Sequence, residues 1–354
     1  MIELETKFAI IGAGLAGTTL AWKLEKQSSD FQIIDANFEK ASFKAAGIIN
    51  PVVFKRLTKS FMVDDCLPEA KNFYFEVEKK LKTKFFFEKT LLKTIKNIAD
   101  QNQWEAKIGE SNFEEYLNPT TNQIINGLKN YHAWGSVKHA GYVDTKTYIS
   151  KSHEFFQKKN KLQIIKKPNS YSQNGNEWLV KNENLMVKAE RVIFCEGPYA
   201  AENPLWSFLP FALTKGETLL IKAERLTIES IIKKDFFLLP LKNGIFKVGA
   251  TYNWNDTSWE KTEKGKQTLI EKLEEIIDCP YEILEHTAGV RPNTKDRRPF
   301  LGEHHTQKGL FIFNGLGSKG VVLAPHFADM IVNFVADNKS LNNDFDINRY
   351  FSNE

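Results

Sequence analysis

Three glycines and one aspartate near the N-terminus have the types and spacing to bind phosphate and ribose. Gly12, Gly14 and Gly17 form a GxGxxG pattern, and Asp35 lies about 20 residues further on. Gly12 would permit a tight turn, Gly14 would let a pyrophosphate approach the backbone, and Gly17 would let a helix pack closely on a strand. A carboxylate at Asp35 could accept hydrogen bonds from a ribose 2′-hydroxyl group. The pattern predicts a dinucleotide site, and the alternative is a glycine-rich turn with a structural role only.

The surrounding sequence supplies the elements that must position these residues. Apolar runs at 8–11 and 31–34 predict two buried strands, the second of which ends at Asp35. Between them, the apolar residues of 15–24 have the spacing of one helix face. The glycines lie where the first strand turns into this helix, so its N-terminus would offer free N–H groups and a positive dipole end to phosphates. A strand–helix–strand context of this kind is far more specific than an isolated GxGxxG.

Small residues gather after the second expected strand. Residues 41–51 read Ala-Ser-Phe-Lys-Ala-Ala-Gly-Ile-Ile-Asn-Pro. Small side chains let a backbone lie against a flat ligand, and the alternative is a loop that leads into a strand.

A second glycine-rich loop lies near the C-terminus. Leu310–Phe313 is expected to form a buried strand, and residues 314–320 read Asn-Gly-Leu-Gly-Ser-Lys-Gly. A helix is expected from about Val321 to Val335, with Pro325 in or near its first turn, where proline is tolerated. The N-terminus of that helix could face an electron-rich group, and the alternative is a plain tight turn.

The rest of the chain alternates between two kinds of segment: strand–helix units like those of the N-terminal region, and short strands joined by turns. Asn243-Gly244 predicts a hairpin between short strands of the segment 216–248. Near Gly141 the strand–helix pattern of the N-terminal region begins again, and Asp144 is a good N-cap for a helix. The interleaving predicts an α/β (α+β) fold with domains that are discontinuous in sequence. Helices are expected over 64–82, 112–117, about 145–159 and about 261–277.

Composition excludes several classes of protein. The 354 residues, 42% of them hydrophobic, suffice for two domains with a sizeable core. No uninterrupted apolar run approaches the ~18 residues of a membrane helix, and the first strand begins too close to Met1 to leave room for a signal peptide. We therefore expect a cytoplasmic protein with no membrane partner. The net charge of +4 is spread over many lysines, which favours solvated faces over a nucleic-acid surface.

Cysteine and histidine residues indicate no metal site. The three cysteines are far apart and form no CxxC pair, so neither a disulfide framework nor a zinc site is expected. Cys195 ends an apolar run and is expected to be a small core residue. His304 and His305 are adjacent in a polar segment, where we expect them to be exposed to solvent rather than to bind a metal.

Several stretches in collinear order resemble one family. The chain is similar to the FAD-dependent D-amino-acid oxidase (DAO) superfamily, near glycine oxidase and the FAD-dependent domain of the bifunctional enzyme that modifies the tRNA wobble uridine. This resemblance spans essentially the whole chain. The stretches that carry it are Gly12-Ala13-Gly14-Leu15-Ala16-Gly17, Ala45 to Pro51, Val248-Gly249-Ala250-Thr251, Gly289 to Gly302 and Gly315 to Gly320.

The resemblance implies a Rossmann-like FAD-binding domain interleaved with a substrate domain whose antiparallel sheet covers the flavin. The FAD-binding domain would comprise 1–50, 140–204 and 288–354, and the substrate domain 51–139 and 205–287. No cysteine lies where some relatives attach flavin covalently, so FAD should bind non-covalently. The residues expected to bind it are Gly12, Gly14, Leu15, Ala16, Gly17, Asp35, Ala36, Ala41, Ser42, Ala46, Gly47, Ile48, Gly315, Leu316, Gly317, Ser318, Lys319, Gly320, Val321 and Val322.

Three positions bear on the substrate. By the resemblance, Arg291 matches the arginine that pairs with a substrate carboxylate. Ser318 falls where glycine oxidase has a substrate-contacting basic residue, and Phe237 falls where it has a pocket tyrosine. These departures count against glycine as the substrate. The loop from Leu316 to Gly320 is closer to the tRNA-modifying relative.

The implied reaction is oxidation of the C–N bond of an amino acid or secondary amine, by hydride transfer to flavin N5. The flavin would do the redox chemistry, and no side-chain base is evident. Alternatives are the removal of a carboxymethyl group from an amine on tRNA, with tRNA as the partner, and a flavoprotein that acts on another small molecule. An NAD-dependent dehydrogenase would need neither the 41–51 loop nor the second glycine loop. No oligomeric state is indicated.

Overall fold

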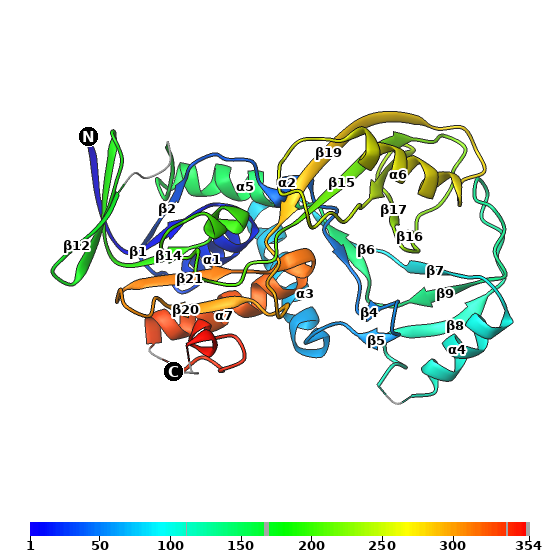
Figure 1. The fold of residues 1–354 in the computed structure, drawn as a ribbon, viewed down its shortest axis with the longest axis horizontal. Coiled ribbons are helices and arrows are strands. Elements are labelled where there is room, and N and C mark those ends of the chain that lie inside the picture. Colours follow the sequence, from blue (N-terminus) through cyan, green and yellow to red (C-terminus); the bar gives the residue numbers. More distant parts are fainter. Residues whose placement is uncertain (111, 166–169, 338, 352–354) are drawn as a thin grey trace.

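The computed structural model describes residues 1–110, 112–165, 170–337 and 339–351. Two eight-stranded sheets lie at opposite ends of an elongated molecule (Figure 1). In the first sheet the order is β11-β2-β1-β14-β13-β12, with β21 beside β14 and β20 beside β21. Its parallel centre joins β11, β2, β1, β14 and β21. The bounds are β1 Ile2–Ile11, β2 Phe31–Asp35, β11 Leu162–Ile164, β12 Ser170–Asn174, β13 Glu177–Lys181, β14 Leu185–Phe194, β20 Phe300–Glu303 and β21 Leu310–Asn314.

Four helices pack together against the first sheet. α1 contacts α7 and α5, and α3 contacts α7. These contacts bury side chains such as Leu20, Tyr74 and Phe327 in one large apolar cluster. A smaller cluster that includes Phe194, Trp206 and Phe300 forms a second part of the core. The helices are α1 Leu15–Lys26, α3 Val63–Leu81, α5 Thr145–Lys158 and α7 Gly320–Asp337.

The second sheet is almost entirely antiparallel. Its order is β19-β15-β18-β17-β16-β7-β9-β8, and only β16 and β7 pair in parallel. α6 packs on β15 and β18, and α4 packs on β8 and β9. The bounds are β7 Leu91–Ile95, α4 Ile98–Ile108, β8 Leu117–Thr121, β9 Ala133–Val137, β15 Thr214–Lys222, β16 Ile231–Lys233, β17 Phe237–Pro240, β18 Ile245–Gly249, α6 Glu263–Glu274 and β19 Glu282–Arg291.

Short elements lie between the two large sheets. β10 pairs with β3 and β6 in a three-stranded sheet, and β4 pairs with β5. These elements are α2 Ala41–Lys44, β3 Ile48–Ile49, β4 Val52–Val53, β5 Thr58–Lys59, β6 Phe86–Glu88 and β10 Gly141–Val143. The 3-10 helices are η1 Gly197–Ala201, η2 Gly317–Lys319 and η3 Ile347–Tyr350.

The α/β (α+β) class expected from the sequence is confirmed, with mixed and antiparallel sheets side by side. Asn243 and Gly244 both have positive φ in the hairpin between β17 and β18. Asp144 caps α5 by accepting a hydrogen bond from the Thr147 backbone N–H. The strands of each sheet come from separate chain segments. The five domain segments named above remain a prediction.

One expectation is wrong, and two elements were not predicted. The short helix expected over 112–117 is wrong, because these residues form turns that lead into β8. The sequence reasoning also missed α4, whose only buried residue is Trp104, and the polar strand β12. Residues Gly317–Asp337 are long and apolar enough to cross a membrane by length and composition, but most of this segment is buried inside the fold. This segment packs on α1 and α3 as a core helix.

Candidate active site

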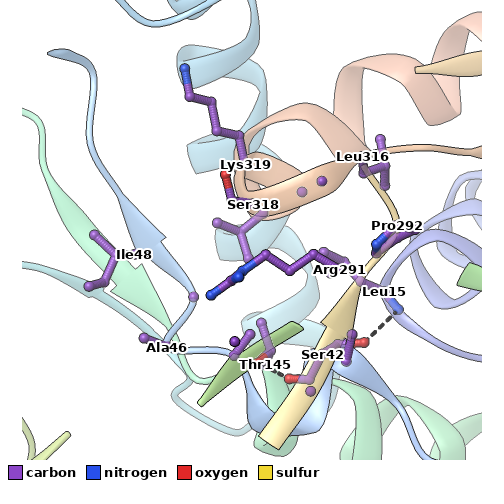
Figure 2. Close-up of a pocket in the computed structure, with 18 of the residues that line it drawn as sticks. Leu15, Ser42, Ala46, Ile48, Thr145, Arg291, Pro292, Leu316, Ser318 and Lys319 are labelled. Carbon is purple, nitrogen blue, oxygen red and sulfur yellow. Dashed lines mark hydrogen bonds between the residues drawn. The ribbon is translucent and has the colours of Figure 1, made fainter. Parts of the chain in front are cut away.

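A cavity of about 1050 Å³ lies between the two large sheets. Its wall combines the first glycine loop, the 41–48 segment, the second glycine loop and one face of the antiparallel sheet. Figure 2 shows Arg291 extending between the loop of Leu316 to Lys319 and the segment of Ser42 to Ile48. The sequence-predicted residues that line it are Gly12, Gly14, Leu15, Ala16, Asp35, Ala36, Ala41, Ser42, Ala46, Gly47, Ile48, Phe237, Arg291, Leu316, Gly317, Ser318, Lys319, Gly320, Val321 and Val322.

The first glycine loop leaves the N-terminus of α1 open to the cavity. Gly12 has φ +97°, and a Cβ there would lie 2.7 Å from the Cys195 carbonyl oxygen. Gly14 precedes α1, and no side-chain hydrogen bond caps the helix there. The Leu15 N–H donates to Ser42 Oγ at 3.2 Å. The cavity is therefore bounded by backbone at the positive end of a helix, where an anion binds favourably.

Gly17 does not line the cavity, and its contact with a cofactor stays a prediction. A Cβ at Gly17 would lie 1.9 Å from the Gly12 carbonyl oxygen. Its small size allows the close packing of α1 under the loop, which is the role its spacing predicted. Cys195 is buried beside this loop as a core residue, and burial raises the pKa of its thiol.

Asp35 ends β2 with its side chain only 4% exposed. Its carboxylate accepts hydrogen bonds from the Ala13 N–H at 2.9 Å and the Asn37 N–H at 3.2 Å. The Lys40 ammonium donates to the same carboxylate at 2.8 Å. Asp35 therefore ties the glycine loop to the end of β2 while it faces the cavity.

The segment after α2 brings backbone to the cavity wall. Gly47 has φ +61°, and a Cβ there would lie 1.9 Å from the Val143 carbonyl oxygen. Lys247, on β18, donates from Nζ to the carbonyl oxygens of Lys44 at 2.7 Å and Ala45 at 3.0 Å. Burial lowers the pKa of Lys247 to about 8. This lysine, which the sequence reasoning missed, joins the antiparallel sheet to the loop of small residues.

The second glycine loop lies beside the first. A Cβ at Gly320 would lie 2.8 Å from Leu15 Cδ2, so the beginnings of α1 and α7 are neighbours. Gly317 has φ +55° and lines the cavity. Gly315 does not line the cavity, and a Cβ there would lie 2.5 Å from Thr294 Cγ2, so its contact with a cofactor stays a prediction. Burial lowers the pKa of the Lys319 ammonium on this loop.

Arg291, the last residue of β19, presents a guanidinium group without an anionic partner. It donates to the carbonyl oxygens of Lys215 and Thr251 at 3.4 Å, and its Cζ lies 4.4 Å from the centre of the Tyr252 ring. Within the described residues, no carboxylate lies within 4.0 Å of it in an ion pair. Burial lowers the pKa of Arg291. The group is oriented by carbonyls and an aromatic ring, and its charge remains available to a ligand.

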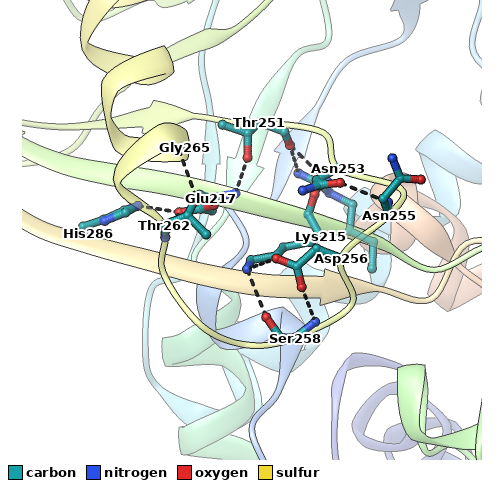
Figure 3. Close-up of polar contacts among 11 residues, drawn as sticks. Lys215, Glu217, Thr251, Asn253, Asn255, Asp256, Ser258, Thr262, Gly265 and His286 are labelled. Carbon is teal, nitrogen blue, oxygen red and sulfur yellow. Dashed lines mark hydrogen bonds and ion pairs between the residues drawn. The ribbon is translucent and has the colours of Figure 1, made fainter.

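A polar network fixes the two carbonyls that orient Arg291 (Figure 3). Lys215 is fully buried, pairs with Asp256 at 2.5 Å and also donates to Ser258. The ammonium of Lys215 lowers the pKa of Asp256 to about 2. Asp256 and Ser258 are thereby held against Lys215 of β15, and the N–H groups of Thr251 and Asn253 donate to the carbonyl oxygens of Glu217 and Lys215 on the same strand.

A second acidic centre extends this network toward α6. The Glu217 carboxylate accepts hydrogen bonds from the N–H and hydroxyl of Thr262, the N-cap of α6. His286 Nε2 lies 2.7 Å from the same carboxylate. The Glu217 N–H donates to Thr251 Oγ1 at 2.9 Å. Thr251 is thus anchored by its side chain while its carbonyl oxygen accepts from Arg291.

Phe237 and Ser318 lie on different walls of the cavity. Phe237 begins β17, and its ring occupies the space beside Gly249, where a Cβ would lie 2.8 Å from Cζ. It presents no hydroxyl group to the cavity. Ser318 lies in η2 and is exposed. The cavity therefore has one apolar wall beside the arginine.

The sequence reasoning missed two further lysines of the cavity wall, Lys93 on β7 and Lys233 on β16. It was also wrong about His304, which is 5% exposed and accepts hydrogen bonds at Nδ1 from the backbone N–H groups of Thr306 and Gln307. In the part of the chain that the structure describes, no group of three or more His, Cys, Asp or Glu side chains could hold a metal ion.

The chain matches the model of one protein family and several curated proteins. Residues 7–334 match the family model DAO, described as FAD dependent oxidoreductase. A glycine oxidase from Bacillus subtilis is 28% identical over 142 residues, which cover 39% of this chain and 37% of that protein. The "tRNA 5-methylaminomethyl-2-thiouridine biosynthesis bifunctional protein MnmC" of Leptospira interrogans is 23% identical over 371 residues, which cover 90% of this chain and 56% of that protein. The chain thus spans well under two thirds of these curated relatives.

Solved structures share the fold at low sequence identity. A glycine oxidase from Geobacillus kaustophilus has a TM-score of 0.78 at 17% identity, with 96% of each chain covered. An iminodiacetate oxidase from Chelativorans sp. BNC1 has a TM-score of 0.76 at 18% identity, with 95% of this chain and 96% of that chain covered.

Proposed function

This chain belongs to the family of FAD-dependent oxidoreductases, and on that premise we propose that it binds FAD non-covalently and oxidises the C–N bond of an amino acid or secondary amine. The observation that carries the substrate proposal is the guanidinium of Arg291. It lines the cavity, is oriented by two carbonyls and a tyrosine ring, and has no ion pair within the described residues. An arginine in this state can bind a carboxylate through two parallel hydrogen bonds.

The residues of the cavity fit FAD. The volume of about 1050 Å³ is at the upper limit for pockets of small ligands, which leaves room for a dinucleotide and a small substrate. Gly12, Gly14 and the start of α1 would hold the pyrophosphate, with Asp35 beside the adenosine ribose. Gly47 and the start of α7 would lie against the flavin. FAD, when bound there, supplies the acceptor for a hydride.

The chain's own residues would bind and orient the amine. Arg291 would fix the carboxylate, which sets the direction of the α-carbon. Phe237 would provide an apolar wall and exclude water from one side. The amine would lose a hydride from the α-carbon and a proton from nitrogen, and water would hydrolyse the resulting imine. The apolar wall at Phe237 favours an amine whose substituent is larger or less polar than that of glycine.

Flavin bleaching without oxygen tests the proposal. The purified protein would be mixed with a panel of free amino acids and secondary amines, and separately with tRNA whose wobble uridine carries a carboxymethylaminomethyl group. We expect bleaching by at least one free amine. Bleaching by the tRNA alone would contradict the free-amine proposal. Flavin that remains with the acid-precipitated protein would contradict non-covalent binding.

A second candidate function is the modification of tRNA. It is supported by the Leptospira relative, whose matched region covers 90% of this chain and whose name includes a tRNA modification. Arg291 would serve this reaction equally, because a carboxymethylamino group also carries a carboxylate. The bleaching experiment with modified tRNA therefore decides between the two candidates.

Replacing Asp35 with alanine is expected to weaken FAD binding by about 1.5–3 kcal/mol, the scale of a lost hydrogen bond to a charged group. The substitution would remove the acceptor for the ribose and would also release the Ala13 N–H. The dissociation constant can be measured by adding FAD to the apoprotein and following the quenching of flavin fluorescence.

Asp30→Ala is the matched control for this prediction. Asp30 lies just before β2, at the other end of that strand, where its carboxylate accepts a hydrogen bond from the exposed Lys7 N–H at 3.2 Å. FAD affinity should be unchanged in that variant. If the Asp35→Ala protein binds FAD as tightly as the unmodified chain, Asp35 does not contact the cofactor.

A further inference from the structure

Two lysines face the cavity side by side on the antiparallel sheet. β16 and β7 pair in parallel with Lys233 opposite Lys93, and β16 and β17 pair with Lys233 opposite Phe237. Residues that are paired across neighbouring strands project from the same face of a sheet, and their Cα atoms lie about 5 Å apart. All three residues line the cavity. Lys93, Lys233 and Phe237 therefore form one row along its wall.

Neither ammonium group in this row has a carboxylate partner within the part of the chain described. Lys233 Nζ donates to the Phe236 carbonyl oxygen at 3.3 Å, and Lys93 Nζ lies 5.7 Å from the Trp104 ring centre. Three other lysines of the same cavity are paired, Lys40 with Asp35, Lys44 with Glu39 and Lys234 with Glu275. Within the described residues, Lys55, Lys96 and Lys319 also line the cavity and form no ion pair. A partly buried cation without a counter-charge is costly unless a ligand supplies one.

Arg291 adds a third positive charge to this region. Burial is the main cause that lowers the pKa of Lys233, to about 8; the Asp235 charge opposes this shift, and the Lys272 and Arg291 charges add to it. Burial also lowers the pKa of Lys93. Three cations on one cavity wall repel each other, and the repulsion falls when anions bind among them. Asp235 and Asp100, which also line the cavity, offset part of the charge of Lys233 and Lys93, and one carboxylate at Arg291 leaves the remaining charge unmatched.

We propose that Lys233 and Lys93 bind a second carboxylate of the substrate, so that the amine oxidised by this protein is a dicarboxylate. The inference rests on the proposed amine oxidation and names the substrate class of the same site. Arg291 would hold the carboxylate next to the reacting carbon, and the lysine pair would hold the distal one. Both lysines are partly buried inside the cavity, whereas phosphates of a large nucleic acid would meet exposed lysines first.

The charge state of Lys233 predicts the pH dependence of binding. The groups that act on this lysine are Arg291, Asp235 and Lys272, and Lys93 lies opposite it on β7. The ammonium is charged below its pKa of about 8 and loses its proton as the pH rises above it. The affinity for a dicarboxylate should therefore fall between pH 7 and 9, while that for a monocarboxylate held by Arg291 should change little.

Calorimetric titration of the FAD-loaded protein tests the lysine pair without turnover. Malonate, succinate and glutarate would be compared with propionate, butyrate and pentanoate. At least one dicarboxylate should bind about 10-fold tighter than its matched monocarboxylate, the effect of one hydrogen bond to a charged group. Lys233→Met and Lys93→Met should each reduce this preference, because methionine keeps the side-chain volume without the charge.

Lys222→Met is the matched control, because Lys222 ends β15 in the same sheet, is exposed and pairs with Glu224 outside the cavity. It should keep the full preference. Equal binding of mono- and dicarboxylates by the unmodified protein, or a preference that survives both lysine substitutions, would overturn the proposal. Binding of unmodified tRNA that both substitutions weaken, without any dicarboxylate preference, would assign the lysines to nucleic acid and overturn it as well.

Flavin bleaching separates this inference from the proposed function. Alanine would be compared with aspartate, and N-methylglycine with iminodiacetate, so that each pair differs by one carboxylate. Faster bleaching at low concentration by the dicarboxylate of a pair supports the inference. Bleaching by both members at equal apparent affinity would keep amine oxidation and overturn the second carboxylate. Bleaching by no amine would contradict the proposed function, while the calorimetric preference would still decide the lysine pair.

Discussion

Replacing Arg291 with alanine should lower kcat/KM for an acidic amine. The corresponding activation free energy should rise by about 2–5 kcal/mol, the range for removing one partner of a buried charge pair. The guanidinium is held by the Lys215 and Thr251 carbonyls and by the Tyr252 ring, so its loss leaves the substrate carboxylate without its cation. Because a misoriented α-carbon also slows the reaction, kcat should fall together with the rise in KM. Anaerobic flavin reduction over a range of substrate concentrations measures both quantities.

Two controls make the Arg291 prediction specific. Arg298→Ala removes an exposed arginine that pairs with Asp344 at 2.8 Å, and surface pairs of this kind contribute little. That variant should keep its activity. An amine without a carboxylate should be oxidised at similar rates by the unmodified protein and by Arg291→Ala. If Arg291→Ala retains its flavin spectrum and full activity on acidic amines, the carboxylate is bound elsewhere.

Replacing Gly47 with alanine should greatly weaken the binding of FAD. The residue has φ +61°, and the new Cβ would lie 1.9 Å from the Val143 carbonyl oxygen in β10. Backbone cannot move away cheaply, so the loop of small residues would shift into the space proposed for the flavin. We expect little FAD in the purified variant, measured from the ratio of flavin to protein absorbance, and a lower free energy of unfolding in urea.

Gly175 provides a matched control with nearly the same backbone angle. It has φ +62° in the turn between β12 and β13, and nothing lies within 4 Å of a Cβ built there. Gly175→Ala should therefore cost only the strain of left-handed backbone, roughly 1–2 kcal/mol. FAD content should stay normal. Equal losses of stability and full FAD in both variants would show that close packing at Gly47 has no special role.

Most of the fold and both glycine-rich loops could be predicted from local patterns in the sequence. The spacing of Gly12, Gly14 and Gly17 reflects a turn and a helix packed within one short segment, so it can be interpreted without knowledge of the rest of the chain. Caps such as Asp144 and the Asn243-Gly244 turn are local for the same reason. Helix α4 was missed because Trp104 is its only buried residue, which leaves no apolar periodicity to detect.

Contacts between distant segments could not be predicted in this way. Lys93 and Lys233 are neighbours only because β7 and β16 pair in parallel with that register. Lys247 meets the carbonyls of Lys44 and Ala45 across the boundary between a sheet and a loop. In the sequence all three are ordinary lysines among many. Their burial, and with it their lowered pKa values, follows from tertiary packing.

The strand order of the first sheet has a consequence for biosynthesis. β14 pairs with β1 along one side and with β13 and β21 along the other, and β21 begins at Leu310, so the parallel centre is completed only when the chain has been made as far as β21. At roughly 5–20 residues per second, residues 192–194 at the end of β14 would wait on the order of 10 seconds on the ribosome with one edge unpaired. Such an edge is a template for association with other chains. Synthesis that stalls before β21 should therefore yield aggregates or chaperone clients rather than a smaller working enzyme.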